Sequence, residues 1–207
     1  MKRTNWDDYD YSHSRANQFF LNQVLKGYNR LLSKAGLKKG ISLLELGSGT
    51  GYNSFRLAKK YDASRVVLVD SNDKALASGK KHFGGQFNVK VVKADVLTVN
   101  LEERFDLVHS QGLIEHFQGK ALVKVINKHL ALVKKGGYLV LFYPTKQGLY
   151  SFIRRLAELT NNWIFSDEVP LSKPEVMKII DNKASLVDST LMMPYFLTEE
   201  GLILKKN

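Results

Sequence analysis

The stretch of this sequence with the clearest chemical potential is a glycine-rich turn that follows an acidic residue. Residues 43–53 read LLELGSGTGYN, so three glycines alternate directly after Glu45. A glycine turn between a buried strand and a helix lets a ligand approach the backbone and the helix N-terminus. Glu45 would repel a pyrophosphate, Tyr52 stands where the dinucleotide pattern needs glycine, and no Gly-Lys-Ser/Thr ends the turn. The turn therefore predicts a small ligand with a cationic end and disfavours NAD, FAD and P-loop chemistry.

Two further carboxylates follow later expected strands. Asp70 ends the strand expected over residues 65–70, and Asp95 comes just after the strand expected over residues 88–93. Because open parallel sheets bind ligands at the carboxyl ends of their strands, we expect both to converge with Glu45. Other interpretations stay open, because Asp70 or one of the three residues after it could cap the next helix and Asp95 could be a turn residue.

The elements that must position these residues alternate between strand and helix from about residue 41 onward. A first helix, capped by Ser12 or Ser14 and ended by Gly36, precedes them. We expect strands at residues 41–46, 65–70, 88–93, 105–109, 138–142, 185–192 and 201–205. We expect helices at residues 52–60, 73–82, 121–133, 149–159 and 173–181, with Gly136-Gly137 closing the helix at 121–133.

This order predicts an α/β fold with a doubly wound, mostly parallel seven-stranded sheet and helices on both faces. The last two strands should pair antiparallel, because too few residues separate them for a crossover helix. We expect one domain over residues 1–207, made of a helical preface (1–40), a cofactor-binding core (41–143), and a helical insert with the final strand pair (144–207).

The amino-acid composition excludes further classes of function. The chain has 207 residues, of which 44% are hydrophobic and 25% charged, so it can bury a sizeable core. It contains no cysteine, which excludes disulfides, thiolate zinc sites and a cysteine nucleophile. Residues 1–8 lack an apolar signal region and no apolar run could span a bilayer, so we expect a soluble, cytoplasmic protein.

The net charge of +11 is carried by residues 1–143, which hold 23 basic and 12 acidic side chains. Such a charge allows nucleic-acid binding, but the basic doublets fall near predicted helix ends, and a solvated surface is the favoured interpretation. We expect no metal site, because His13, His82, His109 and His129 lack metal-ligand spacing with carboxylates.

Five ordered motifs resemble those of the class I S-adenosylmethionine-dependent methyltransferases. They are the acidic-x-G-x-G-x-G turn, Asp70, KADV at 93–96, FDLVHSQGLIEHF at 105–117 and LVKKGGYL at 132–139. The resemblance spans residues 41–143, and the final strand pair extends it to the C-terminus. It implies a Rossmann-like fold, S-adenosylmethionine as cofactor and S-adenosylhomocysteine as product.

The resemblance also implies roles for individual residues. It assigns the methionine part of the cofactor to Glu45, Gly47, Gly49, Gly51, Gln111 and Gly112, the ribose to Asp70, and the adenine to Ala94, Asp95 and Val96. Leu46, Asn53 and Ser71 complete the expected cofactor contacts. His116 is the candidate catalytic proton acceptor, with a packed helix residue as the alternative. Glu115 is either a helix-capping acid or a pocket residue.

The sequence says less about the molecule that would accept the methyl group. His109-Ser110-Gln111-Gly112 differs from the Asn/Asp-Pro-Pro-Tyr of enzymes that methylate adenine, cytosine or glutamine amides. Aromatic and apolar residues outside the cofactor motifs predict a mostly apolar lid over a small organic acceptor, including residues 1–13, with core packing as the alternative. They are Trp6, Tyr9, Tyr11, Tyr143, Tyr150, Trp163, Phe165, Met192, Met193, Tyr195 and Phe196. A methyltransferase of RNA or protein, or a non-catalytic regulatory domain that binds S-adenosylmethionine, remain the alternatives.

Overall fold

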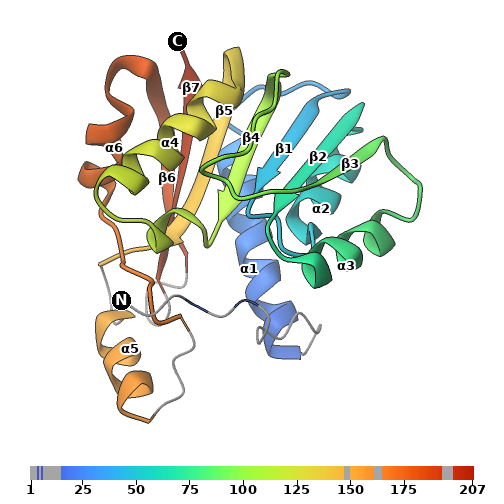
Figure 1. Cartoon of the computed structure of the whole chain (residues 1–207). Coiled ribbons are helices and arrows are strands. Elements are labelled where there is room, and N and C mark those ends of the chain that lie inside the picture. The colour runs from blue at the N-terminus through green and yellow to red at the C-terminus, as the bar shows by residue number, and fades with distance from the viewer. Residues whose placement is uncertain (1–3, 5, 7–14, 147–149, 161–164, 193–197) are drawn as a thin grey trace.

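A computed structural model describes the chain apart from residues 1–3, 5, 7–14, 147–149, 161–164 and 193–197 (Figure 1). Its centre is a seven-stranded sheet in the order β3-β2-β1-β4-β5-β7-β6. The strands are β1 (Ser42–Leu46), β2 (Arg65–Asp70), β3 (Val89–Lys93), β4 (Phe105–Gln111), β5 (Val133–Pro144), β6 (Ala184–Met192) and β7 (Glu199–Lys206). The first five pair in parallel, whereas β7 runs antiparallel to both β5 and β6. The predicted fold class and the antiparallel final pair are therefore confirmed.

Helices cover both faces of this sheet. The α-helices are α1 (Arg15–Leu32), α2 (Tyr52–Tyr61), α3 (Asp73–Phe83), α4 (Lys120–Leu132), α5 (Tyr150–Leu159) and α6 (Lys173–Ile180), with short 3-10 helices η1 (Ile114–His116) and η2 (Asp181–Lys183). One buried cluster joins α1, α2 and α3 to the sheet, and a second joins α4 and α6 to the opposite face. Helix α5 lies apart from both layers, below the sheet in Figure 1.

Local sequence explains where the helices near the carboxyl edge begin. Helix α2 starts directly after Gly51, whose φ of 66° is a left-handed conformation that glycine adopts without strain. Asn72 caps α3, because its side chain accepts a hydrogen bond from the backbone N–H of Ala75. Ser172 and Glu175 form a capping box at α6. The edge that carries the glycine turn is thus fixed by local signals.

One expectation about an element boundary is wrong. Gly136 and Gly137 do not close α4, because the helix ends at Leu132 and β5 begins at once with Val133. Val133 pairs with Phe105 of β4, and both glycines lie inside the longer strand. Pairing with β4 therefore overrides the helix-ending signal of the glycines. Within the described residues, no helix has the length and apolar character needed to cross a membrane.

Candidate functional site

The glycine turn after β1 is held against the end of β2. The backbone N–H of Gly49 donates to Asp70 Oδ2 at 2.8 Å, and the N–H of Ser48 donates to the carbonyl of Val69 at 3.0 Å. Gly47, Gly49 and Gly51 all have φ between 50° and 66°, which other residues adopt only with strain. The turn therefore depends on its glycines, and Asp70 fixes its position.

Asp70 is an organiser of the turn and not the cap of α3. Its Oδ1 accepts the backbone N–H of Asn72 at 2.8 Å, so each carboxylate oxygen receives one backbone hydrogen bond. Asn72 is the residue that caps the helix. Because each carboxylate oxygen has two lone pairs, Asp70 keeps the capacity to accept hydrogen bonds from a ligand.

Glu45 is a buried acid with an unsatisfied oxygen. Only 2% of its surface is exposed, and Oε2 has no hydrogen-bond partner among the described residues. Burial raises the pKa of Glu45 to about 8, against the lowering effect of hydrogen bonds from Ser54 and Asn53. An unsatisfied buried carboxylate oxygen is costly unless a donor reaches it. The ammonium group of an amino-acid ligand would meet that need.

A chain of amide hydrogen bonds continues from this acid across the sheet. Asn53 Nδ2 donates to Gln111 Oε1 at 2.8 Å, and Gln111 Nε2 donates to the buried carboxyl of Glu199 at 3.3–3.4 Å. Gly112 follows with a φ of 65°. The structure thus brings Asn53 and Gln111 together, as the predicted site requires.

The expected adenine contacts, Ala94, Asp95 and Val96, differ from one another in burial. Asp95 is exposed at the end of β3, where its Oδ1 accepts the N–H of Leu97 at 2.7 Å, so it does form the turn that its alternative interpretation predicts. The N–H of Ala94 donates to the carbonyl of Asp70 at 2.9 Å. The side chains of Leu46 and Val96 pack in the hydrophobic core.

A cavity of about 500 Å³ opens beside the ends of β2 and β3. It is lined by Trp6, Ser71, Asn72, Asp73, Lys74 and Lys93. This volume lies within the range of about 300–1,000 Å³ common for small-ligand sites. Ser71 is the predicted cofactor residue that lines it, next to Asp70. The cavity is therefore placed where the ribose and adenine contacts are expected.

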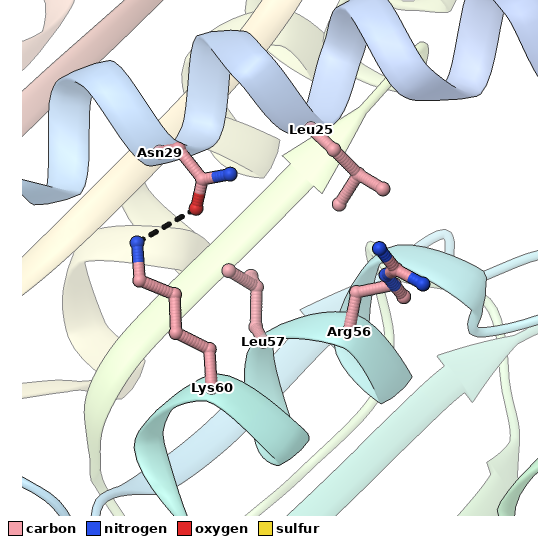
Figure 2. Close-up of a pocket in the computed structure, with 5 residues that line it drawn as sticks. All are labelled: Leu25, Asn29, Arg56, Leu57 and Lys60. Atoms are coloured by element: carbon pink, nitrogen blue, oxygen red, sulfur yellow. Dashed lines mark hydrogen bonds between the residues drawn. The ribbon is translucent and has the colours of Figure 1, made fainter.

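A second, smaller cavity of about 140 Å³ lies between α1 and α2 (Figure 2). Its lining residues are Leu25, Asn29, Arg56, Leu57 and Lys60, with Lys60 Nζ donating to Asn29 Oδ1 at 2.7 Å. These five residues include no carboxylate. The chemistry of this cavity is therefore unrelated to the acidic site at the carboxyl edge.

His116 lies in η1, which follows the central strand β4. Its Nδ1 is 2.8 Å from Asp167 Oδ1, and its ring meets the ring of Trp6 edge to face at 5.0 Å. Burial lowers the pKa of His116, and Asp167 partly opposes that shift. Contact of Nδ1 with a carboxylate favours the tautomer with hydrogen on Nδ1, which leaves Nε2 as the nitrogen able to accept a proton.

Three buried glutamates lie near His116, and their convergence was not predicted from the sequence. Glu115, Glu168 and Glu199 are 1%, 5% and 8% exposed. Burial raises the pKa of each, to about 8 for Glu168 and about 7 for Glu199, and repulsion from neighbouring acids adds to the shift of Glu115 and Glu168. Their only sequence signal was an acid within largely apolar segments. Glu115 lies in the first turn of η1 and is buried, and these acids add polar groups near His116 to the aromatic and apolar residues expected there.

Several other expected residues belong to the core. His109 and His129 are fully buried and bonded to neighbours, and burial lowers the pKa of His129 to about 4 and that of His109 to about 3. Tyr143 and Met192 pack in the two hydrophobic clusters, whereas Phe165 lies near Trp6. The expected lid residues Tyr9, Tyr11, Trp163, Met193, Tyr195 and Phe196, and also His13, lie outside the described residues.

Comparison with known proteins agrees with this geometry. Residues 43–137 match a family described as a methyltransferase domain. A malonyl-[acyl-carrier protein] O-methyltransferase of Ilyobacter polytropus is 28% identical over 102 residues, which is 49% of this chain and 37% of that protein. (S)-Coclaurine N-methyltransferase of Papaver somniferum is 35% identical over 94 residues, or 44% of this chain and 27% of that protein. The chain spans 37% and 55% of two Ilyobacter polytropus relatives.

Solved structures share the fold over nearly the whole chain. The N-methyltransferase NodS of Bradyrhizobium japonicum WM9, in complex with S-adenosylhomocysteine, superposes with a TM-score of 0.71 at 16% identity and covers 98% of this chain and 93% of that one. Magnesium protoporphyrin IX methyltransferase of Synechocystis PCC 6803 gives 0.73 at 15% identity, covering 96% and 90%. Residues 43–137 therefore match a methyltransferase domain, and the chain has the fold of solved methyltransferases that bind S-adenosylhomocysteine.

Proposed function

We propose that this chain transfers a methyl group from S-adenosylmethionine to a small organic acceptor. The observation that carries the proposal is the buried Glu45 with its unsatisfied Oε2, placed beside a glycine turn that Asp70 holds in position. When bound, the sulfonium of the donor supplies an activated methyl group. Catalysis then depends on orientation and on the exclusion of water.

The residues at the carboxyl edge fit each part of such a donor. Glu45 accepts hydrogen bonds from the ammonium group, and the glycine turn allows close approach of the methionine part. Asp70 accepts the ribose hydroxyls, with Ser71 alongside in the larger cavity. Asp95 lies at the adenine end, where it is exposed and accepts a backbone hydrogen bond from its own turn.

In this proposal, the residues near His116 position the methyl acceptor and take up its proton. Trp6 lies between the donor cavity and His116, so it can exclude water from both. His116 Nε2 is the candidate proton acceptor. The buried glutamates around it offer no cationic partner to a phosphate backbone, which favours a small acceptor over RNA despite the basic surface. A reducing, cytoplasmic location fits a cysteine-free chain.

The proposal is tested by calorimetry with S-adenosylmethionine and S-adenosylhomocysteine, followed by transfer from radiolabelled donor to small molecules from native extracts. We expect one site for both ligands, a raised thermal midpoint, and labelled product whose formation depends little on salt. Absence of binding to either ligand contradicts the proposal. Binding without single-turnover transfer favours a regulatory domain, and a steep salt dependence favours a nucleic-acid acceptor.

A further inference from the structure

A second group of polar side chains converges beside the proposed acceptor position. Glu115 and His116 come from η1 after β4, and Glu168 comes from the segment between α5 and α6. One carboxylate oxygen from each glutamate and one ring nitrogen of His116 lie within 4.8 Å of one another. The N–H of Val169 donates to the carbonyl of Glu115 at 2.9 Å, which ties the two segments together.

The two glutamates carry oxygens that the protein leaves unsatisfied. Glu115 Oε2 and Glu168 Oε1 are buried and have no hydrogen-bond partner within the described part of the chain. No salt bridge found among those residues includes either glutamate. Two buried carboxylates that face each other without a cation are strongly unfavourable. A divalent cation between the two groups would satisfy both oxygens and balance the charge of both carboxylates.

Asp167, which is not one of the three converging residues, orients the ring of His116. His116 Nδ1 is 2.8 Å from Asp167 Oδ1, and Asp167 also accepts a hydrogen bond from Thr4. A carboxylate on one nitrogen fixes the ring and leaves Nε2 as the ligand nitrogen, which is the usual outer arrangement of a metal-binding histidine. Binding of an alkylammonium ligand would not require a histidine ring oriented in this way.

We propose that Glu115, His116 and Glu168 bind a divalent transition-metal ion. Metal–ligand bonds of about 2.0–2.2 Å allow ligand atoms to be at most about 4.4 Å apart, so only a small contraction of the observed group is needed. Two carboxylates balance the charge of a divalent ion. The mixed oxygen and imidazole set suits Mn²⁺, Fe²⁺ or Zn²⁺ and is poorly suited to Mg²⁺, which prefers oxygen ligands.

Three protein ligands leave coordination positions open, as in sites where a metal meets a substrate. An oxygen of the acceptor that bound there would be held and made easier to deprotonate. Ligation occupies His116 Nε2, so this role excludes the role of His116 as proton acceptor. Metal binding itself does not depend on the proposed methyl transfer, because it is measured without donor or acceptor.

The test is titration of the full chain with Mn²⁺, followed by electron paramagnetic resonance, together with thermal midpoints in Mn²⁺ or Zn²⁺. Glu168→Gln and Glu115→Gln keep the side-chain shape and remove one ligand charge. We expect each variant to bind Mn²⁺ at least tenfold more weakly and to lose the metal-dependent rise in midpoint. Without metal, both variants should be about as stable as the parent, because the amide keeps the shape of the side chain and adds no buried charge.

Glu200→Gln is the matched control. Glu200 is also buried, at 3% exposure, but it lies near Lys173 and Tyr143 and is not one of the three ligands. It should leave Mn²⁺ affinity unchanged. Equal Mn²⁺ affinity in the parent and in both ligand variants overturns the proposal, as does lack of binding to both metals. A rise in midpoint with ethylammonium and with neither metal also overturns it and assigns the group to an amine.

Discussion

Asp70 shows how one side chain can serve both the fold and the ligand. Its two oxygens receive the backbone N–H groups of Gly49 and Asn72, which join the glycine turn to the start of α3. A ligand hydroxyl would share the same oxygens through their remaining lone pairs. Replacement of Asp70 should therefore affect both the turn and the donor affinity, and the two effects have to be measured separately.

Asp70→Ala should weaken S-adenosylmethionine binding by at least tenfold, and Asp70→Asn by less, because one acceptor oxygen survives. Hydrogen bonds to a charged group contribute about 1.5–3 kcal/mol, and about 1.4 kcal/mol corresponds to a factor of ten. Calorimetry gives the affinities, and thermal melting of the ligand-free variants reports the loss to the turn. Negligible loss of affinity in both variants would remove Asp70 from the site.

At the scale of elements, Trp6 contacts residues from three separate parts of the structure. The carbonyl of Trp6 accepts a hydrogen bond from Asn72 Nδ2 at 3.3 Å, while its ring lies 5.0 Å from His116 and 5.9 Å from Phe165. These partners lie on α3's cap, on η1 and before α6, and none belongs to α1. That residues 1–13 form a lid stays a prediction, and these contacts of Trp6 are the reason to test it.

Deletion of residues 1–13 should leave the thermal midpoint of ligand-free protein nearly unchanged, weaken donor binding modestly and reduce turnover strongly. A segment that closes over bound ligands excludes water and adds an aromatic face, whose attraction to a cation is about 0.5–2 kcal/mol. Thermal melting, calorimetry and steady-state turnover measure the three effects.

Two control variants accompany this deletion. Trp6→Ala removes the aromatic face and keeps the segment, so it should reproduce most of the loss in turnover. In a Trp163→Phe background, the fluorescence of Trp6 should change when S-adenosylmethionine is added. A strongly destabilised truncation, or Trp6 fluorescence indifferent to the donor, would instead assign this segment to the core.

At the scale of the whole molecule, buried histidines and buried glutamates determine how the stability of the fold depends on pH. Burial lowers the pKa of His109 and His129 from 6.5 to about 3 and about 4, so they favour folding increasingly as pH rises to about 6.5. Above that value they are neutral in both states. The pKa of Glu45 is raised from 4.5 to about 8, so the folded chain holds a proton that the unfolded chain has lost.

We therefore expect the free energy of unfolding of ligand-free protein to fall between about pH 6.5 and 8. The stabilising contribution of the raised Glu45 pKa is complete below pH 4.5 and is lost as pH rises through about 8. Glu45→Gln should flatten the fall, as measured by urea denaturation across this window. Glu175→Gln is the control, because hydrogen bonds from Lys146 and Ser172 lower the pKa of Glu175 to about 2. Parallel curves for the parent and Glu45→Gln would contradict the prediction.

The sequence by itself determined the order of strands and helices, the turn from Glu45 to Gly51, and the places of Asp70 and Asp95 at strand ends. These features follow from local periodicity and from glycine conformations, which neighbouring residues specify. Its error at Gly136-Gly137 arose where pairing between β4 and β5 outweighed a local signal.

Only the tertiary structure decided which acids meet. Glu115, Glu168 and Glu199 are separated by tens of residues in sequence, yet all are buried, and Glu168 and Glu199 both raise the pKa of Glu115. It likewise placed Trp6 against His116, 110 positions along the chain. Burial and convergence of distant side chains depend on how the layers pack, and no periodicity within a segment specifies them. Hence the residues of the proposed donor site could be predicted from the sequence, whereas the convergence of the buried glutamates became visible only in the fold.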